Sequence, residues 1–180
     1  MTSLEDIKVS LDSNTNMNDE IRSKFYYLIS IFNNKFKSVN LDTLNNCIKT
    51  VQFGKISALE RKGTYFYDAV ANKIMFSKNL KSNYDIDHLF MKAILEMTTS
   101  TGTFTGFSSD DRLRVLNLAY TEILANYIIG NEGDSDLEEE MLVANLLSHI
   151  VGKDTLFNSY FSNNGEPIIK AMQDTEVGLL

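Results

Sequence analysis

The stretch FMKAILEMTTSTGTFTGF, residues Phe90–Phe107, decides the fold of this 180-residue chain. Its first half continues a helical pattern that begins after Asp85, a residue type that often caps the start of a helix. Apolar residues recur along this pattern at three- and four-residue steps, namely Ile86, Leu89, Phe90, Ala93, Ile94 and Met97. The second half is rich in Thr and Gly, which is typical of a loop. We therefore predict a helix with one face in the core and a loop that leads into the next helix.

A second long helix is predicted directly after this loop. Ser108 and Asp111 have the spacing of a capping box at its start, and Gly130 marks its end. The helix would turn six apolar or aromatic residues inward: Leu113, Leu116, Tyr120, Ile123, Leu124 and Tyr127.

The last third of the chain is also helical in pattern. The acidic run NEGDSDLEEE, residues 131–140, reads as a solvated loop and first helical turn before a helix over Leu137–Val151. The segment TLFNSYFSNNGEPIIKAMQ, residues 155–173, completes the domain, and Pro167 is placed at a helix start.

The first third begins with a polar stretch, residues 1–16, which we expect to be flexible. The run NDEIRSKFYYLISIFNNKF, residues 18–36, then predicts an amphipathic helix. Its apolar face would consist of Ile21, Phe25, Leu28, Ile29 and Phe32. A second, short helix is expected from about Leu41 to Val51.

The middle of the chain changes to a strand-like pattern. Thr64–Tyr67 and Ile74–Phe76 are short runs of aromatic and β-branched residues, and the turn between them holds Asp68 and Asn72. This pattern predicts a β-hairpin. The sequence as a whole thus predicts one α+β domain over residues 1–180, predominantly α-helical, with a small β-hairpin or sheet.

Composition and charge narrow the classes of function. The net charge of -7 gives no basic surface to neutralise phosphates, so nucleic acid is not expected as a partner. The sequence shows neither a signal peptide nor an apolar span, and we expect a cytoplasmic protein without membrane contact. Cys47 is the single cysteine and is expected to be a packing residue. No cofactor motif is present in the sequence.

The order of these patterns carries a resemblance to a known family. Five segments follow one another over roughly residues 63–165: the hairpin YFYDAVANKIMFS, the helix KAILEMTTS, the loop ending in TGF, the helix LNLAYTEILANYI and the tail LFNSYFSNNGE. This arrangement resembles small HExxH-type zinc metallopeptidase-like (zincin-like) proteins of low-GC Gram-positive bacteria and their mobile elements. The framework residues that match are Leu95, Ser100, Leu116, Asn117, Tyr120, Thr121 and Glu122. The resemblance implies a zincin-like helical core.

The same resemblance assigns the metal-binding and catalytic positions to apolar residues. Ala93 falls at the first His, Ile94 at the catalytic Glu, Met97 at the second His and Leu118 at the acidic third ligand. Zinc chemistry of this type needs two imidazoles one helical turn apart and a carboxylate that takes a proton from the metal-bound water. The expectation is a pseudoenzyme that binds no metal, with these four side chains filling the former cavity as core.

The sequence allows two other candidate sites built from ionisable residues. His88, Glu96 and Glu122 could form a relocated ligand set, but we expect His88 and Lys92 to lie on the solvated side of their helix. Glu96 and Glu122 could form a carboxylate pair for acid and base catalysis, although separate surface roles are favoured. His149 is expected near a helix C-terminus.

We therefore expect a non-catalytic protein-binding module, such as an inhibitor, immunity or antitoxin-type factor. Its partner would be another protein with a basic surface, attracted by the acidic residues Glu138, Glu139 and Glu140. Two alternatives stay open: a structural or accessory subunit of a larger protein assembly, and a hydrolase with a non-standard site.

Overall fold

The computed structural model describes residues 2–56, 65–77, 86–107, 109–130 and 137–177. Within these ranges the chain forms eight α-helices, one 3₁₀ turn and one three-stranded sheet. In chain order they are α1 (Leu4–Ser13), α2 (Asp19–Lys35), α3 (Asp42–Ile48), β1 (Gln52–Ile56), β2 (Tyr65–Asp68), β3 (Lys73–Ser77), α4 (Ile86–Thr98), η1 (Asp111–Leu113), α5 (Arg114–Ile129), α6 (Glu138–Val151), α7 (Lys153–Phe161) and α8 (Glu166–Val177). The predicted class, α+β and predominantly helical, is confirmed.

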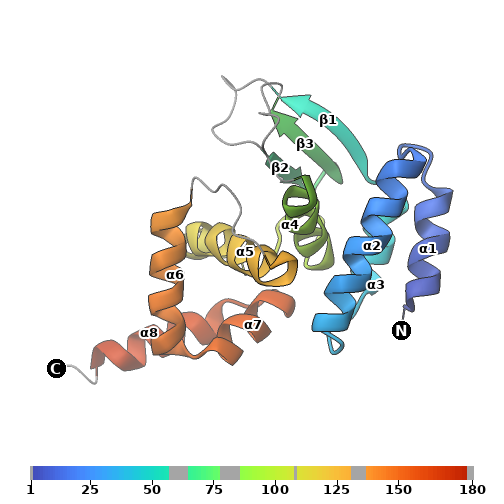
Figure 1. Cartoon of the computed structure of the whole chain (residues 1–180). Coiled ribbons are helices and arrows are strands. Elements are labelled where there is room, and N and C mark those ends of the chain that lie inside the picture. The colour runs from blue at the N-terminus through green and yellow to red at the C-terminus, as the bar shows by residue number, and fades with distance from the viewer. Residues whose placement is uncertain (1, 57–64, 78–85, 108, 131–136, 178–180) are drawn as a thin grey trace.

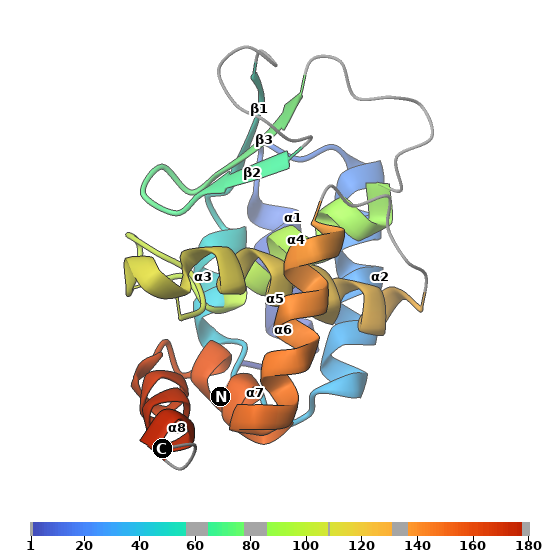
Figure 2. The ribbon, with the colours of Figure 1, turned by 90° about the vertical axis from the view of Figure 1, so that its left-hand side faces the viewer.

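Helix α4 occupies the middle of the molecule. It contacts α2 and α3 on one side, α5 on another and β2 at the end where the sheet lies (Figure 1). Helices α6 and α8 pack on each other, and Figure 2 shows α6 crossing α5. Among the helices of the described ranges, none has the length and apolar character that crossing a bilayer requires.

The central position of α4 buries it on all sides. Every residue from His88 to Thr98 is buried except Lys92, which is half-buried. The predicted apolar face therefore lies in the core, apart from Ile86, which is 38% exposed at the helix start. The proposed cap Asp85 lies outside the described residues. Because α4 has no solvated side, its polar residues must be satisfied by other protein groups.

The N-terminal segment corrects the expectation of a flexible start over residues 1–16. Residues 4–13 form α1, which begins with a capping box: the Ser3 N–H donates to Asp6 Oδ2 at 2.8 Å, and the Asp6 N–H donates to Ser3 Oγ at 3.2 Å. Ile7 and Leu11, one turn apart, are buried against the core. The polar composition concealed this short apolar stripe.

The hairpin that the sequence predicts is present as β2 and β3, which pair antiparallel. Two residues shape its turn. Asp68 Oδ1 accepts the N–H groups of Val70 and Ala71 at 3.0 Å each, and the backbone of Asn72 has a φ of 47°, in the left-handed region that Asn tolerates. Thr64, the first residue of the predicted run, lies outside the described residues.

The sheet has a third strand that the sequence analysis missed. Strand β1 pairs parallel with β3, with Phe53 opposite Ile74, so the strand order is β1-β3-β2. The hairpin turn is also tied to α3, because Asn72 Nδ2 donates to the carbonyl oxygen of Cys47 at 2.8 Å. The predicted helix from Leu41 to Val51 is accordingly shorter, and β1 begins at Gln52.

The Thr- and Gly-rich loop after α4 is fixed by polar contacts from several elements. Thr99 Oγ1 accepts the Gly106 N–H at 2.9 Å, and Asn117 Oδ1 on α5 accepts the Phe107 N–H at 3.1 Å. Asn163 Nδ2, from the turn before α8, donates to the carbonyl oxygens of Thr99 at 2.6 Å and Gly106 at 2.9 Å. The loop is thus a packed connection between α4, α5 and the C-terminal helices.

Helix α5 ends as predicted at Gly130, whose φ of 83° suits a left-handed C-cap. Three of the residues expected to point inward are buried: Leu113, Tyr120 and Leu124. Tyr127 is 61% exposed, contrary to expectation. Its ring lies at the surface against Phe36, with the Lys35 ammonium nitrogen 4.4 Å from the ring centre. Ser108, the other half of the expected capping box, lies outside the described residues.

The last helices agree with the sequence pattern. Helix α6 spans Glu138–Val151, and Pro167 lies in the first turn of α8. Residues 131–136 of the acidic run lie outside the described residues, whereas Glu138, Glu139 and Glu140 form the first turn of α6. Carboxylates at this end favour the helix dipole.

Candidate functional site

A cluster of buried polar side chains lies between α4 and α5. His88 and Lys92, one turn apart on α4, both face Glu122 on α5. His88 Nε2 lies 3.1 Å from Glu122 Oε1, and Lys92 Nζ lies 2.7 Å from Glu122 Oε2. His88 Nε2 is also 2.6 Å from Asn126 Oδ1. Because both neighbours of Nε2 are oxygen acceptors, this ring nitrogen carries a hydrogen.

The charges of this cluster compensate one another inside the protein. The side chains of Glu122 and His88 are only 2% and 6% exposed, and that of Lys92 is 18% exposed. A buried carboxylate without partners would cost several kcal/mol, so the two N–H donors around Glu122 are what make its burial tolerable. Helices α4 and α5 are therefore joined by a polar contact within an otherwise apolar interface.

A second buried contact extends the cluster toward the sheet. The Tyr65 hydroxyl, on β2, donates to Glu96 Oε2 on α4. The Lys92 ammonium nitrogen lies 5.5 Å from the centre of the Tyr65 ring and so connects the two halves of the cluster. Burial raises the pKa of Glu96 to about 7, against the lowering effects of the Tyr65 hydrogen bond and of Lys92. Burial and the neighbouring Glu96 charge also raise the pKa of Tyr65.

This arrangement corrects two expectations from the sequence. His88 and Lys92 do not lie on a solvated side of α4, and Glu96 and Glu122 do not have separate surface roles. The physical reason is that α4 is covered on all sides, so its polar stripe at i, i+4 and i+8 faces α5 and β2. That spacing is the one sequence signal that could have revealed the cluster.

The relocated ligand set of His88, Glu96 and Glu122 is not assembled. Glu96 has Tyr65 as its partner, whereas Glu122 is engaged by His88 and Lys92. Within the described residues, no group of three or more His, Cys, Asp or Glu side chains is arranged to hold a metal ion.

The positions that the family resemblance assigned to zinc chemistry do not form a site either. Ala93, Ile94 and Met97 are fully buried in the core. Leu118 is 43% exposed and does not join them, which corrects the expectation that all four would pack together. It lies one turn before Glu122 on α5. An Ala, a thioether and an exposed Leu do not fit a zinc ion.

His88 and Lys92 are spaced one helical turn apart, as are the two His of a helical zinc motif. In the HExxH pattern, two His at i and i+4 bind zinc with a third ligand from elsewhere, and a Glu directly after the first His acts as general base. His88 and Lys92 have this spacing, and Glu122 faces both. A charged lysine has three donors and no lone pair, so it places a positive charge against Glu122 without binding a metal.

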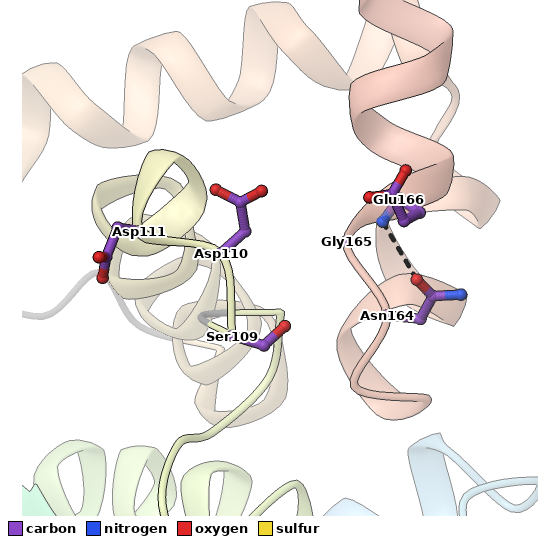
Figure 3. A pocket seen from close by; sticks show the side chains of 6 residues that line it. All are labelled: Ser109, Asp110, Asp111, Asn164, Gly165 and Glu166. Atoms are coloured by element: carbon purple, nitrogen blue, oxygen red, sulfur yellow. Dashed lines mark hydrogen bonds between the residues drawn. The ribbon is translucent and has the colours of Figure 1, made fainter.

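An open acidic pocket lies elsewhere, between η1 and the turn that precedes α8 (Figure 3). It is lined by Ser109, Asp110, Asp111, Asn164, Gly165 and Glu166. Its polar groups serve local turns: Asp110 Oδ1 accepts the Arg112 N–H at 2.9 Å, and Asn164 Oδ1 accepts the Glu166 N–H at 3.1 Å. Asp110 is thus the N-cap of η1, and Asn164 stabilises the turn before α8.

The predicted partner-binding residues lie at the start of α6. Glu138 and Glu139 are exposed and Glu140 is half-buried. Beyond this acidic turn, α6 presents four exposed apolar side chains: Leu142, Val143, Leu146 and Ile150. Sequence analysis did not single out these four residues, although their spacing marks one face of a helix.

Comparisons with known proteins leave the family resemblance as an expectation. No family model, no curated protein and no solved structure matches this chain.

Proposed function

We propose that this chain is a non-catalytic protein-binding module, a metallopeptidase-like pseudoenzyme that acts as an inhibitor, immunity or antitoxin-type factor. The observation that carries the proposal is the complete burial of Ala93, Ile94 and Met97 in the core, at the positions where the family resemblance places the first zinc ligand, the catalytic Glu and the second zinc ligand. The polar contact on the same helix, Lys92 with Glu122 at 2.7 Å, is an ion pair within the protein. Ile94 supplies no general base.

The buried cluster supports a structural role for these residues. A metal ion stabilises a folded protein by binding its ligands, and a buried carboxylate ligand without the ion would be left uncompensated. In this chain Lys92 and His88 compensate Glu122 directly. The proposed core therefore needs no ion for its stability.

The surface of α6 supports protein binding as the activity. Its exposed acidic turn, Glu138 and Glu139, adjoins the exposed apolar side chains of Leu142, Leu146 and Ile150. An apolar strip beside charged residues is the kind of surface that binds another protein, because burial supplies affinity while the charges steer encounter. The acidic sign favours a basic partner.

A metal and activity measurement tests the non-catalytic half of the proposal. The full chain, purified without chelator and dialysed, is expected to carry far less than one zinc per chain by elemental analysis and to hydrolyse no peptide. About one zinc per chain retained after dialysis, or metal-dependent hydrolysis, would overturn it.

A kinetic measurement tests the binding half once a partner is isolated. Converting Glu138–Glu140 to Gln should slow association more than it speeds dissociation, and association of the unchanged protein should slow as salt rises. A matched control removes the same charge from the other side of the molecule, with Glu5→Gln, Asp12→Asn and Glu20→Gln. Association that is indifferent to salt and to the α6 substitutions would remove the acidic surface from the proposal. Copurification of one target enzyme supports an inhibitor, whereas recovery of a multiprotein complex supports the alternative of an accessory subunit.

A hydrolase with a non-standard site is the second candidate, and one observation favours it. Glu96 has a pKa of about 7, close to the value that suits a general acid or base, and it is hydrogen bonded to Tyr65. However, Glu96 is only 7% exposed, and Glu122, the other carboxylate of the expected pair, is engaged by Lys92 and His88. We therefore rank this candidate below a binding module.

A further inference from the structure

The turn between α7 and α8 contains Asn164–Gly165, the only Asn-Gly pair in the sequence. Asn164 is exposed, whereas Gly165 is buried. A Cβ at Gly165 would lie 2.3 Å from Cδ1 of Leu113, a core residue that is 4% exposed. The close approach of the turn to Leu113 therefore favours glycine directly after Asn164.

The side chain of Asn164 is held against the backbone that follows it. Its Oδ1 accepts the Glu166 N–H at 3.1 Å (Figure 3). The ring that this hydrogen bond closes contains both Cγ of Asn164 and the backbone nitrogen of Gly165, so the two atoms are held on the same side of the turn. The N–H donor also polarises the side-chain carbonyl and would stabilise negative charge that develops on its oxygen.

The two other groups needed for a reaction at Cγ have no hydrogen-bond partner within the described residues. The Gly165 N–H donates to none of them, so the backbone nitrogen is available as a nucleophile. Asn164 Nδ2 likewise has no partner among them, and Figure 3 shows it pointing away from Glu166. A nucleophile, a polarised carbonyl and an unrestrained leaving group thus meet at one exposed residue.

Two nearby asparagines lack this combination. Asn163 Nδ2 donates to the carbonyl oxygens of Thr99 at 2.6 Å and Gly106 at 2.9 Å, so its amide nitrogen is held in place. Asn158 is exposed but lies within α7, where the N–H of the next residue, Ser159, is engaged in the helix. Both are internal controls for Asn164.

We propose that Asn164 is a site of spontaneous deamidation in the folded protein. The Gly165 nitrogen loses its proton to hydroxide and attacks Cγ of Asn164, and the bond from Cγ to Nδ2 breaks as Nδ2 takes up a proton and leaves as ammonia. The product is a five-membered succinimide. Water then opens the ring at one of its two carbonyls. Cleavage at Cγ gives Asp, and cleavage at the backbone carbonyl gives isoaspartate; in total one water is consumed and one ammonia is released.

The two products should affect the fold differently. Each adds a carboxylate to the rim of the pocket that Asp110, Asp111 and Glu166 already line. Asp keeps an oxygen acceptor for the Glu166 N–H, and its charge is favoured near the start of α8. Isoaspartate lengthens the backbone by one atom between Asn163, which is tied to the loop after α4, and α8. We therefore expect the isoaspartate form to melt at a lower temperature than the Asp form.

Peptide mapping of the full chain tests the proposal. The protein is incubated at pH 8 and 37 °C, sampled over several weeks and digested with trypsin, and the unincubated sample serves as the blank for reaction during digestion. Cleavage after Lys153 and Lys170 places Asn158, Asn163 and Asn164 in one peptide. Fragmentation of this peptide should locate the mass increase at residue 164, as both Asp and isoaspartate, while the other two residues stay unchanged.

Two matched variants check the assignment in the intact protein. Asn164→Gln should abolish the acidic form that ion exchange separates from the aged protein, because a glutamine would have to close a less favourable six-membered ring. Asn158→Gln should form it like the unchanged protein. Circular dichroism melts before incubation check that both variants are folded.

Three results would overturn the proposal. One is an intact Asn164 in the folded protein when a synthetic peptide of residues 158–170 deamidates under the same conditions, since the fold then protects this residue. Another is equal reaction at Asn158 or Asn163. The third is an acidic form that persists in Asn164→Gln. The reaction needs neither partner nor metal, so zinc content and peptidase assays test the proposed function independently.

Discussion

The ammonium nitrogen of Lys92 lies 2.7 Å from Oε2 of Glu122, and the carboxylate side chain is only 2% exposed. This contact joins the central helix α4 to α5 at a place where the sequence suggested two solvent-exposed residues. The contact supplies the positive charge that the buried carboxylate needs from within the chain.

Removal of Lys92 should destabilise the fold strongly. Lys92→Met leaves the Glu122 carboxylate buried with His88 as its remaining ionisable partner, and the loss is expected to be about 3–5 kcal/mol in urea unfolding. Adding Glu122→Gln to Lys92→Met should recover much of this loss, because the uncompensated charge is then gone. Lys153→Met, an exposed control, should stay within about 0.5 kcal/mol of the unchanged protein. A Lys92→Met variant as stable as that control would contradict the assigned pairing.

Lys92→His should create a metal-binding site. The variant has two His at i and i+4 and a Glu facing them, which is a His2Glu donor set. We expect it to bind Zn²⁺ or Co²⁺ and to melt at a higher temperature with metal than without, because binding to the folded state stabilises it. The control Lys92→His with Glu122→Gln lacks the third ligand and should gain less. Equal melting temperatures with and without metal for Lys92→His would show that its donors do not converge.

Restoring ligands at the positions that the family resemblance suggests should have the opposite result. Ala93→His, Ile94→Glu and Met97→His place polar or charged groups in fully buried positions, and each is expected to cost several kcal/mol or prevent folding. Leu118→Glu, at a position that is 43% exposed, should change stability by less than about 1 kcal/mol. Thermal melts of the four single variants decide this. An unchanged melting temperature for Ile94→Glu would mean that this position is accessible to water.

The folded protein should lose stability as the pH rises, because Glu96 titrates. Its pKa is raised from an ordinary 4.5 to about 7 in the folded protein, so the folded state holds the proton more tightly than the unfolded state. This contribution is fully present below pH 4.5 and is lost as the pH rises through about 7. The loss is on the order of 3 kcal/mol.

The Glu96→Gln variant isolates this effect. Glutamine keeps an oxygen acceptor for the Tyr65 hydroxyl but cannot ionise, so the variant should gain stability relative to the unchanged protein between pH 5 and pH 8. Glu96→Leu is the control that also loses the hydrogen bond. Urea unfolding at both pH values provides the comparison. If the difference between Glu96→Gln and the unchanged protein is the same at both values, Glu96 does not titrate in this range.

Gly106 should tolerate no side chain, unlike Gly102 in the same loop. Both have positive φ, 55° and 85°, but a Cβ at Gly106 would lie 2.1 Å from Asn117 Oδ1, whereas a Cβ at Gly102 meets nothing within 4 Å. Gly106→Ala should therefore cost about 3 kcal/mol and Gly102→Ala only about 1 kcal/mol. Chemical unfolding of the two variants measures the packing contribution by difference. Equal losses would mean that Asn117 and Tyr160 both move aside without cost.

Local sequence pattern was sufficient for most of the helices and for the hairpin. The face of α4, the end of α5 at Gly130 and the place of Pro167 in α8 depend on residues within about one helical turn of each other. Such signals survive in a single sequence because they require no knowledge of what packs opposite. Helix α1 and strand β1 were not predicted, because both depend on the elements that pack against them. A ten-residue helix is marginal alone and is held by α2 and α3, and β1 is a short strand whose partner is β3.

The sequence by itself therefore determined the fold class, the buried Ala93, Ile94 and Met97, and the acidic character of the protein. Only the tertiary structure decided which of its polar and apolar helix faces are buried and which are exposed. His88, Lys92 and Glu96 have the spacing of a solvated helix side, yet α5 and β2 cover them, while the apolar strip of α6 is left exposed. The physical reason is that periodicity specifies which residues share a face, whereas burial depends on the neighbour that packs against it, and here that neighbour comes from a distant part of the chain.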